Sequence, residues 1–415
     1  MQPSDIPIAV DAALVERLLL ELAQFGACET TGVSRTVYSP EWVAAQNQYA
    51  AWCAEAGLRV RRDAVGNVWG RLDGALDGSV IVSGSHIDSQ RPGGRYDGAL
   101  GVISGYVALR TLKERFGAPR RSLECVSFCE EEGSRFPGAA FWGSRAVTGS
   151  IQPGEAEQLH SYDGVTMAAA MGAVGLDAGR ITEVARNDID AYIEMHIEQG
   201  PVLEQAGLPA AIVNAITGLR HYEVELRGRA DHAGAAPMDW RLDPMAGAAE
   251  IITGVTATAQ HMGRPAVTTV GRLLVEPNGA AIVPEKVTFT IDARHPDPIA
   301  LQTLFQRHEE LIMAIAQRRG LELNLRVIFD HPPCPADPDL VRTLEEAARE
   351  QGIPTLTMHS GAGHDAQVMA QKAKMAMIFV QSKGGRSHTP AEYTSIEHAV
   401  AGIQILAAAL HRLAY

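Results

Sequence analysis

The sequence lacks the features of a nucleic-acid-binding or membrane protein. Basic residues are in the minority, since 36 Lys and Arg stand against 49 Asp and Glu in 415 residues, for a formal net charge of -13. Such a chain repels a phosphate backbone, so we expect no nucleic-acid partner. It also has no uninterrupted apolar run of 18 or more residues. We therefore expect no membrane-spanning helix and no membrane partner.

Cysteine is scarce, and several catalytic motifs are missing. The five cysteines are widely spaced, and no Cys-x-x-Cys occurs. That pattern argues against a disulfide framework and is typical of reduced thiols, so we expect a cytoplasmic protein. The chain has neither a G-x-S-x-G nucleophile elbow nor a Walker A sequence. Their absence argues against an α/β-hydrolase serine nucleophile and a P-loop.

Hydrophobic residues make up 46% of the chain, enough for a large core in two or three domains. Apolar strand-like runs alternate with helical patterns in the first half and again near the C-terminus, which favours a doubly wound, mostly parallel sheet in the α/β class. The segments that carry this pattern are Ser79–Ser83, Ala99–Phe116, Ser122–Phe128, Thr355–Met358 and Met375–Val380.

A different order of predicted strands and helices interrupts this pattern in the middle of the chain. The segments read β-α-β-β-α-β, which is typical of a ferredoxin-like α+β module. We therefore predict a catalytic domain at 1–211 and 329–415, with a smaller domain inserted at 212–328. The inserted segments are Tyr222–Leu226, Pro244–Met262, Ala266–Val275, Lys286–Ala293, Leu301–Arg318 and Leu321–Ile328.

Polar side chains follow two of the predicted strands and precede a helix. His86 and Asp88 stand two apart at a strand end, where a carboxylate could orient a metal-bound imidazole. Asp97 lies among glycines just before a helix, where it could bind a metal or cap the helix. Glu130-Glu131-Glu132 ends a buried strand, and adjacent carboxylates repel one another unless a cation compensates.

Two further histidines, His196 and His388, also lie near strand ends or loops. Each alone would most often be structural. Together with the acidic residues they form a set that suits Zn²⁺ or a similar divalent ion. A carboxylate next to a ligand could also serve as a general base.

Two competing interpretations remain. Gly361-Ala362-Gly363-His364-Asp365-Ala366 matches a G-x-G-x-x-A dinucleotide fingerprint, but the following strand does not end in the acidic residue that a ribose would need. A dehydrogenase is therefore a weak alternative. A metal-free binding protein is the other, and the complete set of candidate ligands argues against it.

Several strings, in order along nearly the whole chain, resemble the hydantoinase/carbamoylase branch of the M20 di-metal amidohydrolases. The branch includes N-carbamoyl-L-amino-acid hydrolase, allantoate amidohydrolase and β-ureidopropionase. The matching strings are GSHIDSQRPGGRYDGALGV, EEEGSRFPGA, HIEQGPVLE, DHAGAAPM, NGAAIVPEKVTFTIDAR, SGAGHDAQ and SHTPAEYT.

The resemblance implies two divalent metal ions per subunit, Zn²⁺ or alternatively Mn²⁺, Co²⁺ or Ni²⁺. His86 and His196 would bind one ion, Glu132 and His388 the other, and Asp97 would bridge both. Asp88 would orient His86. Glu131 would be the general base, taking a proton from a metal-bridging water that attacks the carbonyl carbon. The implied reaction cleaves the carbamoyl C–N bond of an N-carbamoyl-L-amino acid or a related ureido acid.

The resemblance also implies substrate-binding residues. Gln199 would contact the carbamoyl or amide group, and His232 would help to hold the oxyanion. Asn278 and Arg294 would bind the substrate carboxylate, for which the planar guanidinium is well suited. Backbone groups of Gly361, Ala362 and Gly363 would also face the substrate.

The inserted domain would act as a lid and as the contact of a homodimer. His232 could then serve its own subunit or its partner's. Leu219-Arg220-His221 stands where relatives often carry Gln-Arg. Because such lid residues select the substrate, an allantoate amidohydrolase or an N-acyl-L-amino-acid amidase with the same mechanism remains an alternative.

Overall fold

The computed structural model describes residues 7–415. Their contacts divide them into two compact units. Unit 1 extends to Asn214 and also contains Ala336–Met358 and Ala362–Tyr415, whereas unit 2 consists of Ala215–Pro335 with His359–Gly361. Within residues 7–415, no helix is long and apolar enough to cross a membrane.

Unit 1 is built on a nine-stranded sheet whose central strands are parallel. These central strands follow the order β18 (Lys374–Val380), β7 (Ile189–Ile197), β5 (Leu76–His86) and β6 (Arg121–Phe128). Antiparallel strands flank them, with β8 (Ala210–Ile216) beside β18, and β4 (Val68–Leu72) and β3 (Arg59–Arg62) beyond β6. The predicted mostly parallel α/β sheet is confirmed. The short β16 (Cys334–Pro335) and β17 (Thr355–Ser360) pair with β8.

Helices cover both faces of the parallel strands. Gly402 of α12 (Ile396–Ala414) lies against the Met195 side chain of β7, whereas the Ala366 N–H of α11 (Asp365–Met369) donates to Glu194. Consecutive strand residues point to opposite faces, so these two helices lie on opposite sides of the sheet. Both faces are therefore buried, which explains the nearly unbroken apolar run of β18.

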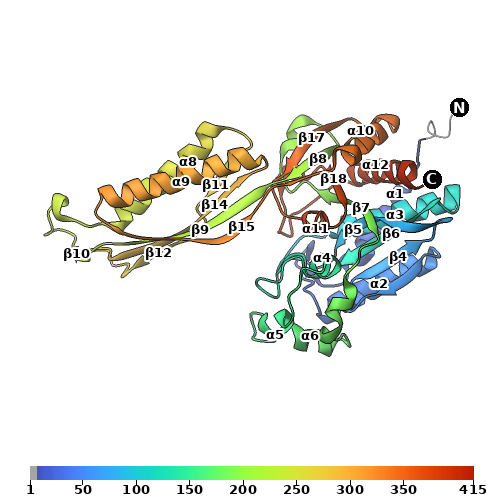
Figure 1. The fold of residues 1–415 in the computed structure, drawn as a ribbon, viewed down its shortest axis with the longest axis horizontal. Helices are drawn as coiled ribbons and strands as arrows, with labels where there is room; N and C mark the ends of the chain where they lie inside the picture. Colours follow the sequence, from blue (N-terminus) through green and yellow to red (C-terminus); the bar gives the residue numbers. More distant parts are fainter. Residues whose placement is uncertain (1–6) are drawn as a thin grey trace. The chain divides into compact units, whose positions relative to one another are not determined.

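The remaining helices of unit 1 complete these layers. Helices α1, α3, α10 and α12 contact one another and gather at one side of the sheet (Figure 1). Their bounds are α1 (Ala12–Ala23), α3 (Ala99–Phe116) and α10 (Pro338–Glu350). The other elements of this unit are β1 (Ala27–Cys28), β2 (Gly32–Val33), α2 (Pro40–Glu55), α4 (Trp142–Thr148), α5 (Glu155–Gln158), α6 (Met167–Ala173), η2 (Ala178–Val184), α7 (Val202–Ala206) and η4 (Lys383–Gly385).

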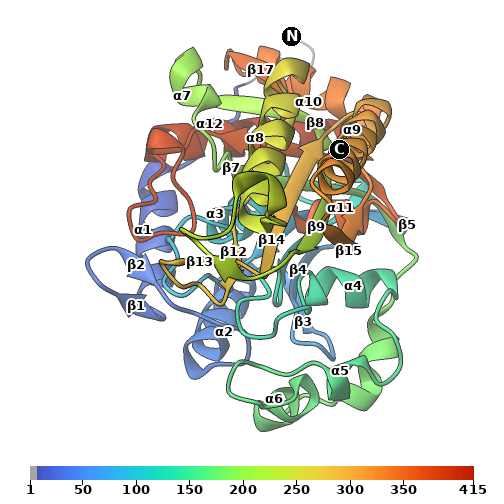
Figure 2. The ribbon, with the colours of Figure 1, turned by 90° about the vertical axis from the view of Figure 1, so that its left-hand side faces the viewer.

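Unit 2 has the β-α-β-β-α-β order of the ferredoxin-like prediction. Its antiparallel sheet has the order β11-β14-β9-β15, and β12 also pairs with β14. Helices α8 and α9 cover one face of the sheet (Figure 2), where Val224, Phe289 and Leu304 join one apolar core. The bounds are β9 (Gly218–Arg227), α8 (Pro244–Met262), β11 (Val267–Thr269), β12 (Leu273–Glu276), β14 (Lys286–His295), α9 (Pro298–Arg318) and β15 (Glu322–His331), with the short β10 (Asp231–His232), η3 (Met238–Trp240) and β13 (Ile282–Val283) outside this sheet.

The prediction of one continuous strand at Ala266–Val275 is wrong. The segment forms two strands, because the pairing with β14 shifts between them. Thr269 pairs with Asp292 but Leu273 pairs with Phe289, so one side advances four residues while the other advances three. The extra residue makes a bulge next to Gly271, a residue that often marks such a break.

Candidate metal centre

The C-terminal ends of three parallel strands meet at one edge of the unit 1 sheet. Strand β5 ends at His86, β7 ends just after His196, and β6 leads into Glu130–Glu132. Ligands of doubly wound sheets bind at this edge. Asp97 comes from the loop that precedes α3, and His388 from the loop between η4 and α12.

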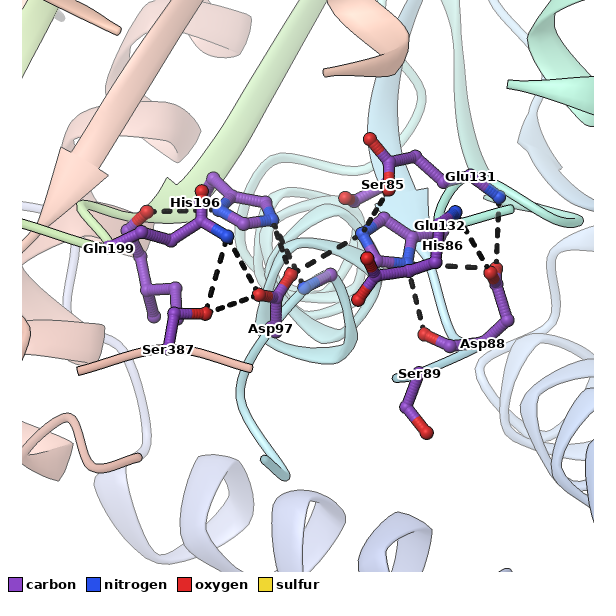
Figure 3. Close-up of polar contacts among 12 residues, drawn as sticks. Ser85, His86, Asp88, Ser89, Asp97, Glu131, Glu132, His196, Gln199 and Ser387 are labelled. Carbon is purple, nitrogen blue, oxygen red and sulfur yellow. Dashed lines mark hydrogen bonds and ion pairs between the residues drawn. The ribbon is translucent and has the colours of Figure 1, made fainter. Parts of the chain in front are cut away.

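The five predicted metal ligands converge there, in two groups that share Asp97 (Figure 3 shows four of them). In one group, Asp97 Oδ1 lies 3.5 Å from His86 Nε2 and 3.2 Å from His196 Nε2. In the other, His388 Nε2 lies 3.5 Å from Asp97 Oδ2 and 3.4 Å from Glu132 Oε2. Each carboxylate oxygen of Asp97 therefore faces a different group.

These separations fit a divalent ion in each group. Tetrahedral ligands about 2.1 Å from a zinc ion lie about 3.4 Å from one another. The observed contacts of 3.2 to 3.5 Å match that spacing. The donor atoms, imidazole nitrogens with carboxylate oxygens, are also those that Zn²⁺, Mn²⁺, Co²⁺ and Ni²⁺ accept.

The two buried histidines are held so that Nε2 faces Asp97. His86 Nδ1 lies 3.1 Å from the Asp88 carbonyl oxygen, and His196 Nδ1 lies 2.9 Å from the Ile197 carbonyl oxygen. Donation from Nδ1 leaves the lone pair on Nε2, the atom that can bind a metal. In His196 this atom accepts the Gly98 N–H at 3.1 Å. Gly98 makes room for this packing, because a Cβ at its position, with φ of 60°, would lie 2.4 Å from the His86 ring.

The charges of the site act on one another strongly. Burial disfavours a charged His86, but Glu131, Asp97 and Asp88 outweigh burial and raise its pKa well above the usual value. Burial alone would raise the pKa of Asp97, yet His196 and His86 hold it well below its usual range. The protonation of the carboxylates therefore depends on the charge of the imidazoles, and the reverse is also true.

Asp88 connects the two strand ends. Its side chain is fully buried, and its oxygens accept the main-chain N–H groups of Glu131 at 3.3 Å and Glu132 at 3.2 Å. Its Oδ1 also lies 3.6 Å from His86 Nδ1. Asp88 thus fixes the backbone of the predicted base and of one ligand, in addition to its predicted contact with His86.

The three consecutive glutamates have separate environments. Glu130 is fully buried and accepts the main-chain N–H groups of Arg135 and Phe136, so it braces a loop. Glu131 Oε2 lies 3.5 Å from His86 Nε2, inside the site. Burial raises the pKa of Glu131 well above its usual value, and the nearby Glu132 raises it further, although His86 opposes both effects. A proton acceptor of raised pKa is what general-base chemistry near neutral pH requires.

Gln199 contacts the shared ligand. Its Nε2 donates to Asp97 Oδ2 at 2.8 Å, and its Oε1 is a buried atom without a hydrogen-bond partner in residues 7–415. The sequence motif indicated contact with substrate but not this contact with Asp97. The unpartnered oxygen is a free acceptor for an N–H group of a ligand.

Sequence reasoning missed three residues that hold the ligands. Glu392 accepts the main-chain N–H groups of Tyr96 and Asp97, each at 2.9 Å. Ser387 Oγ lies 2.6 Å from Asp97 Oδ2 and 2.9 Å from Glu392 Oε2, and Gln90 Nε2 donates to Glu132 at 2.8 Å. Burial and the nearby Asp97 raise the pKa of Glu392 to about 7. The signal in the sequence was their position in the quoted motifs: Ser387 and Glu392 flank His388, and Gln90 follows His86 and Asp88.

A third cluster, Glu194, His196 and His364, lies behind the first. Glu194 already accepts Ser85 Oγ at 2.7 Å and the Ala366 N–H at 3.0 Å. These bonds occupy its two oxygens, so this cluster is better explained by hydrogen bonding than by a further ion. His364 packs its ring 4.6 Å from that of His196.

The glycine motif that resembled a dinucleotide fingerprint joins β17 to α11, a helix of only five residues. A Rossmann site needs a long helix whose N-terminus meets the pyrophosphate, so the structural context of that motif is missing. Gly361 belongs to unit 2, where its carbonyl oxygen accepts Arg294 Nη1 at 2.6 Å. Ala362 and Gly363 belong to unit 1.

The other predicted substrate residues lie in unit 2. Arg294 forms a bidentate pair with Asp292, whose Oδ2 lies 2.6 Å from His221 Nε2. These three side chains line a pocket of about 610 Å³ within this unit. His232 and Asn278 are exposed, and His232 Nδ1 accepts the Gly234 N–H at 3.0 Å.

Comparison with known proteins gives concordant results. The profile of the peptidase family M20/M25/M40 matches residues 82–412. The chain is 40% identical to allantoate amidohydrolase of Escherichia coli (strain K12), covering 97% of this chain and 98% of the relative. It is 37% identical to N-carbamoyl-L-amino-acid amidohydrolase of Paenarthrobacter aurescens, covering 95% and 96%. The crystal structure of a hydantoinase/carbamoylase family amidase from Burkholderia multivorans superposes with a TM-score of 0.91 at 34% identity, covering 98% of each chain.

Proposed function

The chain belongs to the peptidase M20/M25/M40 family, and we propose that it is a metal-dependent amidohydrolase that cleaves the carbamoyl C–N bond of a small ureido acid. The observation that carries this proposal is the pair of ligand groups that share Asp97, with Glu131 beside them. This arrangement would suit two divalent ions with an adjacent proton acceptor. His86 and His196 would hold one ion, and Glu132 and His388 the other.

The two ions, when bound, would supply Lewis acidity at the carbonyl oxygen and activate water. Side chains of the protein transfer the protons of the reaction. Glu131 Oε2 accepts a proton from the water whose oxygen forms the new bond to the carbonyl carbon. The same carboxyl group then delivers that proton to the leaving nitrogen as the C–N bond breaks. Since Glu131 returns to its carboxylate form, no other acid is needed.

Gln199 supports a substrate with an N–H next to its carbonyl group. Its Nε2 is bound to Asp97, so the side-chain amide cannot turn freely. Its buried Oε1, which has no partner in residues 7–415, is then a fixed acceptor. A ureido or amide N–H satisfies such an acceptor, whereas an ester oxygen does not. We therefore assign Gln199 to the recognition of the scissile ureido group.

Unit 2 supplies a candidate site for the acid end of the substrate. Asp292 accepts one N–H each from Nε and Nη2 of Arg294, and the Gly361 carbonyl oxygen accepts one from Nη1. A guanidinium has five N–H donors, so one on Nη1 and one on Nη2 remain for an incoming carboxylate. We propose that this unit is the lid of a homodimer and that Asn278 and His232 also serve the substrate, His232 at the oxyanion.

Allantoate is the first substrate to test. The allantoate amidohydrolases of Escherichia coli and Bacillus subtilis are 40% and 41% identical to this chain, whereas the carbamoyl-amino-acid enzymes are 37% to 38% identical.

The five cysteines form no disulfide, which supports the reducing cytoplasm as the location of the protein.

Ammonia release by chelator-stripped protein tests the proposal. The panel contains allantoate, several N-carbamoyl-L-amino acids and N-carbamoyl-β-alanine, each without metal and with Mn²⁺, Co²⁺ or Zn²⁺. N-acetyl amino acids, assayed for the free amine, represent the amidase alternative. We expect turnover of one ureido class only after metal is added. Equal turnover without metal, or metal binding without turnover of any ureido acid, contradicts the proposal.

A further inference from the structure

Arg35 is an arginine buried against the loop that carries His86 and Asp88. It is only 2% exposed. Its Nε donates to the Ile87 carbonyl oxygen at 2.6 Å, and its Nη1 donates to the carbonyl oxygens of Leu22 at 2.8 Å and Phe25 at 2.9 Å. These bonds all go to backbone carbonyls, so the guanidinium joins two chain segments and not a pair of side chains.

Within residues 7–415, no carboxylate forms an ion pair with Arg35. A buried cation in such surroundings is costly and therefore requires an explanation. Burial lowers the pKa of Arg35 to about 10, and the nearby Asp88 partly opposes this effect. The guanidinium therefore keeps its charge at neutral pH. It stands behind a site that holds the buried carboxylates of Asp88, Asp97 and Glu131.

Hydrogen bonds near Arg35 also join its segment to the loop that follows His86. The Arg35 N–H donates to Ser89 Oγ at 2.9 Å, and the Ser89 N–H donates to the Arg35 carbonyl oxygen at 3.1 Å. Val33 and Gly93 exchange two main-chain bonds of 3.0 and 2.8 Å. The segment from Val33 to Arg35 thus runs along the loop that leads from His86 toward Asp97.

The other end of the guanidinium fixes this loop to the core. Leu22 lies in the last turn of α1, whose final carbonyls have no partner within the helix, and Phe25 follows soon after. A cation at this end also interacts favourably with the helix dipole. Helix α1 is anchored by buried side chains that include Leu18 and Leu22. Arg35 therefore holds the Ile87 carbonyl at a fixed place relative to the end of α1.

We propose that Arg35 is a positioning residue of the metal centre, which sets the His86–Ser89 loop by bridging the Ile87 carbonyl to the end of α1. Ile87 lies between His86, a predicted ligand, and Asp88, which holds the backbone of Glu131 and Glu132. A shift at Ile87 thus moves groups on both sides of the site. The residue touches neither ion nor substrate and acts through the loop alone.

This inference rests on the proposed metal site, and its test measures metal binding directly. Chelator-stripped wild type, Arg35→Lys and Arg35→Met are titrated with Mn²⁺ and Zn²⁺ against a chromophoric chelator, and the visible spectrum of each Co²⁺-loaded protein is recorded. Lysine keeps the charge but lacks the planar fork that reaches three carbonyls at once. Leu344→Ala is the matched control, because it removes a buried side chain from α10 and leaves α1 and the loop unaltered.

We expect both Arg35 variants to lose metal affinity by about 10- to 100-fold, the usual effect of removing a group that orients ligands, and the Co²⁺ spectrum to change. Leu344→Ala should unfold at a lower temperature yet keep wild-type affinity and spectrum. Wild-type affinity and spectrum in Arg35→Lys overturn the inference, as does an equal loss in Leu344→Ala. Should Arg35→Met fail to fold, Arg35→Lys decides alone. If the wild type binds no divalent ion, the proposed function fails first.

Discussion

Glu392 accepts the main-chain N–H of Asp97 at 2.9 Å, although the two residues stand 295 positions apart in the chain. The same carboxylate lies 2.9 Å from Ser387 Oγ, next to His388 in sequence. One buried side chain thus fixes the loop of Asp97 and the loop of His388. The two predicted ligand groups therefore have a common support.

We predict that Glu392→Ala lowers metal affinity or kcat by about 10- to 100-fold, because both loops lose their support. Glu392→Gln should lose much less, since the amide oxygen can still accept the N–H groups of Tyr96 and Asp97. Metal content after gel filtration and kcat at saturating metal measure the two effects. Wild-type values for the alanine variant would contradict this role.

Glu131→Gln tests the proton acceptor. The amide keeps the shape of the side chain but cannot take a proton, so we expect kcat to fall by about 10²- to 10⁴-fold or more. Metal content should stay unchanged, because Glu131 is not one of the five predicted ligands. The comparison is made on metal-loaded protein with Glu41→Gln, a change in the first turn of α2, as control. Substantial retained turnover would rule out Glu131 as the base.

Arg294→Ala tests recognition of the acid end. We expect KM for carboxylated substrates to rise by about 10- to 100-fold, the effect of losing a hydrogen bond to a charged group, with a smaller change in kcat. Arg326→Ala, at an arginine that is 64% exposed and paired with Glu223, should leave KM unchanged. An unchanged KM in Arg294→Ala would place the carboxylate elsewhere.

Asp292→Asn tests the electrostatics of unit 2. Burial opposes ionisation of Asp292, but Arg294 and His221 hold its pKa well below the usual value. Its stabilising effect is therefore present above the unfolded pKa of about 3.9 and is lost as pH falls toward the folded pKa.

Urea denaturation followed by circular dichroism, at a series of pH values, measures this effect. The midpoint difference between wild type and Asp292→Asn should be largest at neutral pH and should shrink below about pH 4. Asp330→Asn removes the charge of a carboxylate that is 47% exposed and pairs with Arg220, and it should show a small difference throughout. A difference for Asp292→Asn that grows with acidity would reverse the assigned sign.

Much of the fold could be predicted from local patterns. Pro244–Met262 and Ala99–Phe116 are helices with the predicted bounds, because a regular apolar spacing and clear ends specify them. The comparisons confirm the predicted family and the amidohydrolase class. The strand break at Gly271 could not be predicted, since it depends on pairing with β14.

The site was predictable where a motif supplied the chemistry, and less so where tertiary contacts do. Glu131 and Glu130 are neighbours of the same type, and only the fold turns one toward His86 and the other toward a loop. No motif in the sequence marks Arg35, because its acceptors are backbone carbonyls. Such roles leave no spacing pattern to detect.

The position of β18 has a consequence for how the protein is made. This strand lies between β7 and β8 in the sheet, yet it is formed by residues 374–380. During synthesis, His86, Asp97, Glu132 and His196 are therefore made long before β18, which pairs with β7 on the side opposite to β5. The fifth predicted ligand, His388, comes later still. A truncated product that ends before His388 would therefore lack one predicted ligand of the second group.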